Sequence, residues 1–229
     1  MRKKTALFGL IGLVVLLALS AGILTAFTGN DSDELIVEVT ITNLTRGQTM
    51  TSVFVARHDG SAAPLYTLGQ PASDGLASMA EDGSASGLLG AWDPDENSSV
   101  AEARTAGGLI RPGQSVTISF NISDGKQLLS LASMLVSTND GFIGANSLDL
   151  SSSKVVYLNV YDAGSEGNSE SCDFVPGPPC NSHNARDTAT AEGFVHVHAG
   201  IHGDGGLDPA QHDWRNPAAR LEIKTWKRI

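Results

Sequence analysis

Short segments in which apolar and polar residues alternate are the feature that most limits the fold of this chain. In residues 35–42 the apolar side chains of Leu35, Val37, Val39 and Ile41 stand at every second position. Successive side chains of a β-strand point to opposite faces, so this period of two predicts a strand with one buried face. Polar and small residues separate such segments throughout the chain, which favours a β-rich domain over a helical one.

Further segments rich in Val, Ile and Thr are bounded by clusters of Gly, Pro and Asp. They cover residues 52–57, 115–122, 128–136, 154–160, 193–198 and 220–226. About seven or eight strands of this kind predict an all-β fold, an antiparallel β-sandwich with short helices in its loops. The helices are expected at residues 73–80 and 98–106, with Ser73 and Ser98 as N-caps. No internal repeat is evident, so residues 35–229 are interpreted as one domain.

The N-terminus combines a basic flank with a long apolar run. Arg2, Lys3 and Lys4 precede an uncharged apolar stretch over residues 6–27. This order is typical of a secretion signal, and the run is also long enough to span a bilayer as a helix. Residues 1–29 are therefore interpreted as a signal peptide or a membrane anchor, followed by a polar linker at residues 30–34. Either alternative predicts a protein that is secreted or anchored at the outer face of the cytoplasmic membrane.

The charge balance excludes one class of partner. The chain has 15 basic and 25 acidic residues, and without Arg2, Lys3 and Lys4 the remainder carries a net charge of −13. Binding to nucleic acid needs Lys and Arg to neutralise phosphates, so no nucleic-acid partner is expected. Familiar catalytic motifs, such as a Walker loop or a nucleophile elbow, are also absent from the sequence. The protein is therefore not expected to be an enzyme.

The two cysteines agree with export. Cys172 and Cys180 lie in one loop rich in Pro and Gly (SCDFVPGPPC), and the sequence contains no other cysteine. In an oxidising compartment, two cysteines in one short loop are expected to form a disulfide.

Two groups of residues could bind metal ions. Asn139, Asp140 and Gly141 follow one apolar segment, and the acidic stretch of residues 161–168 (YDAGSEGN) follows another. Loop carboxylates and carbonyls are the oxygen ligands that Ca²⁺ prefers, although Asp and Asn in loops also form ordinary turns.

The second group is a histidine cluster. His196 and His198 stand two residues apart in a predicted strand and therefore share a face, and His202 follows in the next loop. These three imidazoles could bind a transition metal such as zinc or copper, as a metal-handling site or the centre of a metallohydrolase. The alternative is that they are structural histidines on a half-exposed strand.

Several longer motifs together resemble a known family. They are VTITNLT (39–45), LGQPASDGLASMAEDG (68–83), IRPGQS (110–115), LASMLVSTNDGFIG (131–144), VYDAGSEGNSE (160–170), VPGPP (175–179) and GFVHVHAGIHG (193–203). In this order they are similar to the spondin N-terminal domain family in its short prokaryotic single-domain form, related to the N-terminal domain of F-spondin and mindin. The likeness covers nearly all of residues 35–226.

The resemblance implies an eight-stranded antiparallel sandwich that acts in cell-surface or matrix adhesion and not in catalysis. It implies a calcium site in two loops, and the matching positions in this chain are Asp140, Asp162 and Glu166. The partner would be a surface or matrix protein or a glycan, and residues 6–27 could tether the domain to a membrane. The family pattern assigns no role to His196, His198 and His202.

Overall fold

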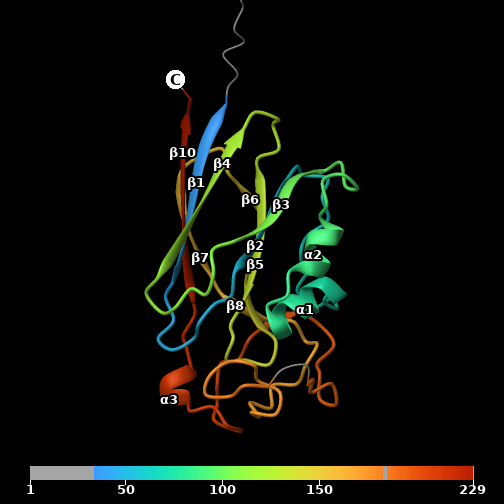
Figure 1. Ribbon diagram of the computed structural model, residues 1–229, viewed down its shortest axis with the longest axis vertical. Coiled ribbons are helices and arrows are strands. Elements are labelled where there is room, and N and C mark those ends of the chain that lie inside the picture. Colours follow the sequence, from blue (N-terminus) through green and yellow to red (C-terminus); the bar gives the residue numbers. More distant parts are fainter. Residues whose placement is uncertain (1–33, 183–184, 229) are drawn as a thin grey trace, which may run out of the picture. The chain divides into compact units, whose positions relative to one another are not determined.

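The computed structural model describes residues 34–182 and 185–228, which form two antiparallel sheets (Figure 1). The four-stranded sheet has the order β4-β1-β10-β7, and the six-stranded sheet has the order β3-β2-β5-β6-β8-β9. The strands are β1 (Leu35–Asn43), β2 (Val53–His58), β3 (Val100–Ala106), β4 (Ser115–Ile122), β5 (Leu128–Met134), β6 (Gly141–Asp149), β7 (Lys154–Leu158), β8 (Val160–Asp162), β9 (His196–Val197) and β10 (Ala219–Lys227). The helices are α1 (Asp74–Asp82), α2 (Ser86–Ala91) and α3 (Pro209–His212).

The alternating apolar residues of β1 form one side of the core. Val37, Val39 and Ile41 are fully buried, and β1 pairs along its whole length with β10. These side chains pack with Leu129 and Leu131 of β5 in one hydrophobic cluster between the sheets. The antiparallel sandwich predicted from the sequence is therefore confirmed, whereas the signal or anchor at residues 1–29 lies outside the described residues.

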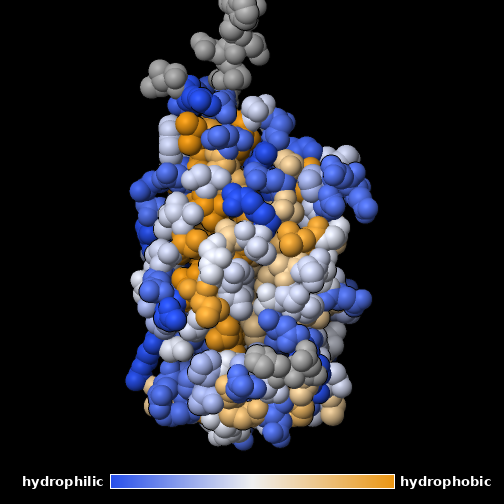
Figure 2. Space-filling model, in the orientation of Figure 1, coloured by the Kyte–Doolittle hydropathy of each residue, from blue (hydrophilic) through white to orange (hydrophobic). Residues whose placement is uncertain are grey.

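A second apolar cluster lies on the outer face of the six-stranded sheet. Phe54 of β2 and Phe142 of β6 pack there with Leu76 and Met79 of α1. Every residue of β2 is consequently buried, because the strand is covered on both faces. Figure 1 shows α1 and α2 beside this sheet. Figure 2 shows apolar atoms in a band along one face of the domain, flanked by hydrophilic side chains.

The strand count differs from the expected eight, since the described part of the chain contains ten strands. The segment predicted as one strand over residues 154–160 is divided: β7 pairs with β10, and after Asn159 the chain crosses to the other sheet as β8. The segment 141–149 was not predicted as a strand and forms β6.

One predicted helix is confirmed and the other is wrong. Ser73 caps α1, because its side chain accepts a hydrogen bond from Leu76 N, and α1 ends at Gly83 in the left-handed conformation. Residues 100–106, by contrast, form β3 although they contain several helix-forming residues. The exposed edge of β2 needs a partner for its backbone groups, and β3 pairs with β2 from Val53 to His58.

The disulfide between Cys172 and Cys180 is confirmed. Its loop is held against the turn that follows β5, where Ser137 Oγ donates a hydrogen bond of 2.7 Å to Pro178 O. No helix within residues 34–182 and 185–228 combines the length and the apolar character that a membrane crossing requires.

Candidate functional site

Three chain segments meet at the end of the six-stranded sheet. The β5–β6 turn supplies Asp140, the end of β8 supplies Asp162, and β9 supplies His196. In the strand register Asp162 lies opposite Gly141 on one side and opposite His196 on the other. Asp162 therefore lies at the centre of the group, between the turn that carries Asp140 and the strand that carries His196.

Asp140 is fully buried and holds the loop that follows β8. Its Oδ2 accepts hydrogen bonds from Ser165 N (2.8 Å), Ser165 Oγ (3.2 Å) and Glu166 N (3.0 Å). Its Oδ1 is also buried and accepts no hydrogen bond from the described residues. One oxygen of Asp140 thus orders the loop, while the other remains available to a ligand.

Asp162 is fully buried as well, but both of its oxygens have partners. Oδ1 accepts from Gly164 N at 2.7 Å, and Oδ2 accepts from Asn168 Nδ2 at 2.6 Å. These bonds fix the orientation of the carboxylate. Each oxygen still has a lone pair for another ligand.

Glu166 is buried with neither carboxylate oxygen in a hydrogen bond to the described chain. The nearest countercharge is Arg186, whose Nε lies 3.5 Å from Glu166 Oε1. Arg186 is shared with the end of α1, since it also forms ion pairs with Glu81 and Asp82. One guanidinium therefore pairs with three carboxylates, so the negative charge of Glu166 is only partly compensated.

The pKa values of the buried carboxyls reflect this shortage of countercharge. Burial, together with the charge of Asp162, raises the pKa of Asp140 to about 7. Burial raises the pKa of Glu166 to about 8, against the opposing effect of Arg186. The pKa of Asp162 is also raised, again mainly by burial. The site holds more acidic groups than its own cations can keep ionised.

The histidines of the predicted three-residue set are placed differently from one another. His196 and His198 both face Asp162, with Nε2 lying 3.4 Å from Oδ1 and 3.9 Å from Oδ2 respectively. His198 is buried, which lowers its pKa to about 3. His202 is exposed, and its backbone N–H donates to Glu170. The shared face of His196 and His198 agrees with their spacing in the sequence.

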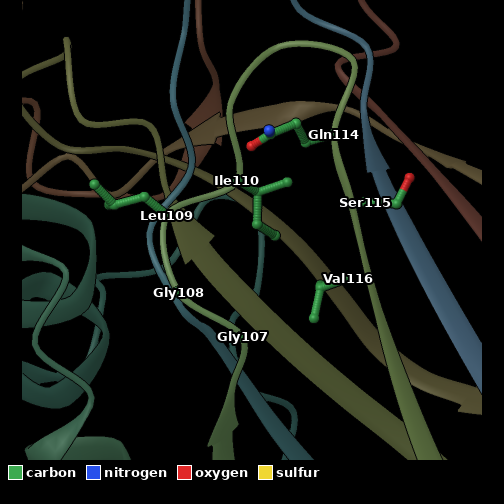
Figure 3. Close-up of a pocket in the computed structure, with 7 residues that line it drawn as sticks. All are labelled: Gly107, Gly108, Leu109, Ile110, Gln114, Ser115 and Val116. Atoms are coloured by element: carbon green, nitrogen blue, oxygen red, sulfur yellow. The ribbon is translucent and has the colours of Figure 1, made fainter.

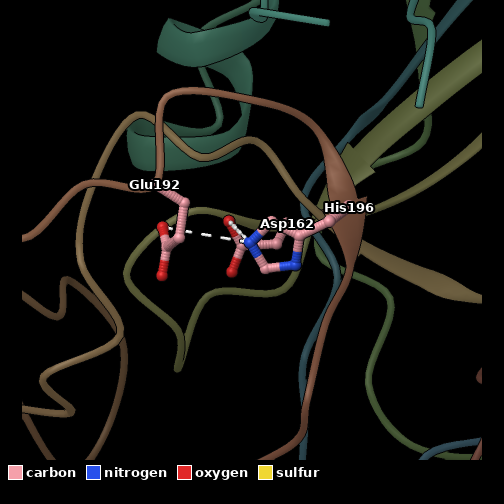
Figure 4. A group of neighbouring side chains, drawn as sticks. All are labelled: Asp162, Glu192 and His196. Carbon is pink, nitrogen blue, oxygen red and sulfur yellow. Dashed lines mark ion pairs between the residues drawn. The ribbon is translucent and has the colours of Figure 1, made fainter. Parts of the chain in front are cut away.

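A carboxylate that the sequence did not suggest joins this group. Asp162, Glu192 and His196 each offer one ligand atom, and these atoms all lie within 4.8 Å of one another (Figure 4). Glu192 precedes β9 by four residues in a loop without any periodic pattern. Its role could not have been recognised without the three-dimensional arrangement.

A pocket elsewhere in the domain lacks comparable chemistry. It has a volume of 420 Å³ and is formed by the connection between β3 and β4 (Figure 3). Its lining consists of Gly107, Gly108, Leu109, Ile110, Gln114, Ser115 and Val116. Because none of these side chains is titratable, the acidic end of the six-stranded sheet is the stronger candidate site.

Comparison with known proteins identifies the family of the domain. The Spondin_N family model matches residues 43–188, which is more than half of the chain. A search of curated proteins gave no match. The matched range includes Asp140, Asp162, Glu166 and Arg186 but ends before the histidine motif. The chain therefore belongs to the Spondin_N family.

Proposed function

We propose that this protein is an extracytoplasmic adhesion domain that binds calcium through Asp140, Asp162 and Glu166. Spondin_N domains are non-catalytic, extracellular adhesion-type domains, and the disulfide between Cys172 and Cys180 agrees with that location.

The observation that carries the calcium proposal is a set of buried carboxylate oxygens that lack hydrogen bonds within the described residues. Asp140 Oδ1 and both oxygens of Glu166 are buried and make no hydrogen bond within the described residues. Leaving a buried polar group unpaired is costly, and the cost is larger when the group is charged. Ca²⁺ takes oxygen ligands, including carboxylates, so the chemistry of these donors fits that ion.

The bound ion would supply positive charge that the described residues of the site lack. Asp140, Asp162 and Glu166 would hold it, and with their repulsion offset the loop at residues 162–170 would be fixed against the β5–β6 turn. Binding residues are often found on loops that a rigid scaffold positions. We therefore place the adhesive surface at this end of the sandwich.

The partner that fits this surface is a cell-surface or matrix protein or a glycan. The domain would be secreted, or held at the outer face of the cytoplasmic membrane through residues 6–27. In either case the acidic end loops would face the extracellular medium, where calcium is available to complete them.

Calcium is expected to raise the melting temperature of the purified chain, prepared without a His tag and stripped with a chelator. At 100 times the Kd, ligand binding contributes about 2.7 kcal/mol to stability. For a domain of this size that corresponds to an increase of about 5–10 °C, measurable by differential scanning calorimetry at pH 8.

Matched variants test whether the effect arises at the proposed site. Asp140→Asn should abolish the calcium response, whereas Asp95→Asn, which makes the same change at an exposed position, should leave it intact. A wild-type protein that does not respond to calcium, or an Asp140→Asn variant that responds like the wild type, would refute the site.

A further inference from the structure

His196 lies with Asp162 and Glu192 in a cluster of ligand-type side chains beside the proposed calcium site. We propose that Asp162, Glu192 and His196 bind a divalent transition metal ion, with Zn²⁺ as the best fit. This site goes beyond the calcium proposal: it shares Asp162 with that set but takes an imidazole nitrogen as a ligand. It also differs from the set expected from the sequence, because Glu192 replaces His198 and His202.

The tautomer of His196 is the one that a metal ligand requires. Its Nδ1 lies 3.1 Å from Val197 O, and a carbonyl oxygen can only accept, so Nδ1 carries the hydrogen. In the neutral ring Nε2 then holds the free lone pair. This Nε2 is buried, has no hydrogen-bond partner among the described residues, and faces Asp162 and Glu192. Metal-binding histidines commonly donate their other ring N–H to a backbone carbonyl in this way.

The distances between the donor atoms suit a small metal ion. His196 Nε2 lies 3.4 Å from Asp162 Oδ1 and 3.9 Å from Glu192 Oε2. In a tetrahedral zinc site with bonds of about 2.0–2.1 Å, neighbouring donors are about 3.3 Å apart. The three ligand atoms lie within 4.8 Å of one another, so Glu192, whose side chain is 30% exposed, would move inward to reach this spacing.

A second layer of hydrogen bonds orients the two carboxylates. Asn168 Nδ2 donates to Asp162 Oδ2 at 2.6 Å and to Glu192 Oε1 at 3.3 Å, so one amide connects both side chains. Gly164 N also donates to Asp162 Oδ1. Partners of this kind keep ligand atoms in position and tune metal affinity.

Backbone pairing holds the three residues close together. Asp162 and His196 are directly opposite each other in the β8–β9 pairing. The loop that carries Glu192 is held to the β8 turn, where Gly193 N donates to Gly164 O at 2.8 Å. A Cβ atom at Gly164 would lie 2.3 Å from Phe194 O, so only glycine permits this close approach.

The other two histidines are excluded for different reasons. His198 Nδ1 accepts a hydrogen bond from Gly200 N at 3.0 Å, so the proton of the neutral ring is on Nε2. That nitrogen faces Asp162 as a donor and has no lone pair for a metal. His202 is exposed and does not belong to the group of ligand atoms within 4.8 Å.

Zinc titration calorimetry on the chelator-stripped, tag-free full chain tests the proposal. We expect one Zn²⁺ per chain for the wild type. Loss of a hydrogen-bond partner that orients a metal ligand typically lowers metal affinity about 10–100-fold, so loss of a direct ligand in His196→Ala or Glu192→Gln should lower it by at least about 100-fold. His202→Ala is the matched control and should bind as the wild type does. Substitution by Co²⁺ should give visible absorption that disappears in His196→Ala.

The outcomes separate this site from the calcium site. Glu192→Gln should lose zinc but keep the calcium response, and Asp140→Asn should lose calcium but keep zinc. The partly exposed position of Glu192 makes that variant tolerable for folding even if His196→Ala is not. Wild-type protein without stoichiometric zinc, or zinc affinity unchanged in Glu192→Gln, would overturn the proposal. If zinc binding were lost in His202→Ala but retained in Glu192→Gln, the metal ligands would instead be His196, His198 and His202.

Discussion

Calcium-free protein is expected to lose on the order of 5 kcal/mol of unfolding free energy between pH 5 and pH 8.5. The pKa of Asp140 rises from the ordinary value of 3.8 to about 7, and that of Glu166 from 4.5 to about 8. A carboxyl with a raised pKa in the folded state favours the folded state while it is protonated. That contribution is complete below about pH 4 and is lost as the pH rises through 7 and 8.

Calcium should reverse this trend, because it binds the ionised carboxylates. Near pH 5 the ion competes with protons and adds little stability, whereas near pH 8.5 it should restore most of what the chelated protein lost. Urea unfolding at both pH values, with calcium and with chelator, measures the difference directly. His198 opposes part of this trend: burial lowers its pKa to about 3, so below about pH 6.5 only the unfolded state takes up its proton, which costs about 2 kcal/mol at pH 5. The range stops at pH 5 because carboxyls with lowered pKa values, such as those of Asp124 and Asp149, lose their stabilising contribution at lower pH.

The variants Asp140→Asn and Glu166→Gln should each reduce this pH dependence, since neither replacement side chain can ionise. Asp95→Asn, at an exposed site, is the matched control and should leave the profile unchanged. Chelated wild-type protein that is more stable at pH 8.5 than at pH 5 would contradict the account of the buried carboxyls.

Replacement of Glu170 by alanine is expected to destabilise the protein by about 2–4 kcal/mol. The buried Glu170 carboxylate accepts hydrogen bonds from three successive backbone amides, His202 N (2.5 Å), Gly203 N (2.7 Å) and Asp204 N (3.1 Å). Removing it leaves three N–H groups without their acceptor, and each unpaired buried donor costs about 1–3 kcal/mol. Because the loop at residues 202–204 is exposed, water can bind some of these N–H groups. The expected loss of stability is therefore smaller than the sum of three buried donors.

Urea unfolding and hydrogen exchange together check the role of Glu170. The amides of residues 202–204 should exchange faster in Glu170→Ala, and Glu170→Gln, which keeps an acceptor oxygen, should lose about half as much stability. Glu96→Ala removes an exposed glutamate and should have little effect. A loss below about 1 kcal/mol in Glu170→Ala, with the three amides still protected, would show that the loop is held by other contacts.

Segments with one buried face were predictable from the sequence. The polar positions of β1 and β4 alternate with buried ones, and that pattern marks a strand before any partner is known. Ser73, as an N-cap, likewise predicted the start of α1 from the local sequence. These features depend on neighbouring residues only.

Segments whose state depends on distant contacts were not predictable. The strand β6 was not predicted. It contains Gly144, where a Cβ atom would lie 2.8 Å from the Tyr66 ring, so glycine serves close packing there. Residues 100–106 have helix-forming composition, yet pairing with β2 makes them a strand. Tertiary pairing overrode the local propensity.

The residues of the candidate site also differ in whether the sequence could predict them. Asp140, Asp162 and Glu166 could be suggested from motifs that resemble the family. Glu192 and Glu170 could not, because the first depends on the close approach of Phe194 to Gly164 and the second on a loop more than 30 residues further along the chain.

A crystal structure of the protein grown with calcium at pH 8 would show whether Asp140, Asp162 and Glu166 bind the ion. We expect one calcium ion, identified by its anomalous signal, bonded to oxygens of Asp140, Asp162 and Glu166 at about 2.3–2.6 Å. Asp140 Oδ1 and the Glu166 carboxylate would thereby gain partners. A structure at saturating calcium in which these oxygens bind only water or protein donors, or in which the ion lies elsewhere, would contradict the calcium site.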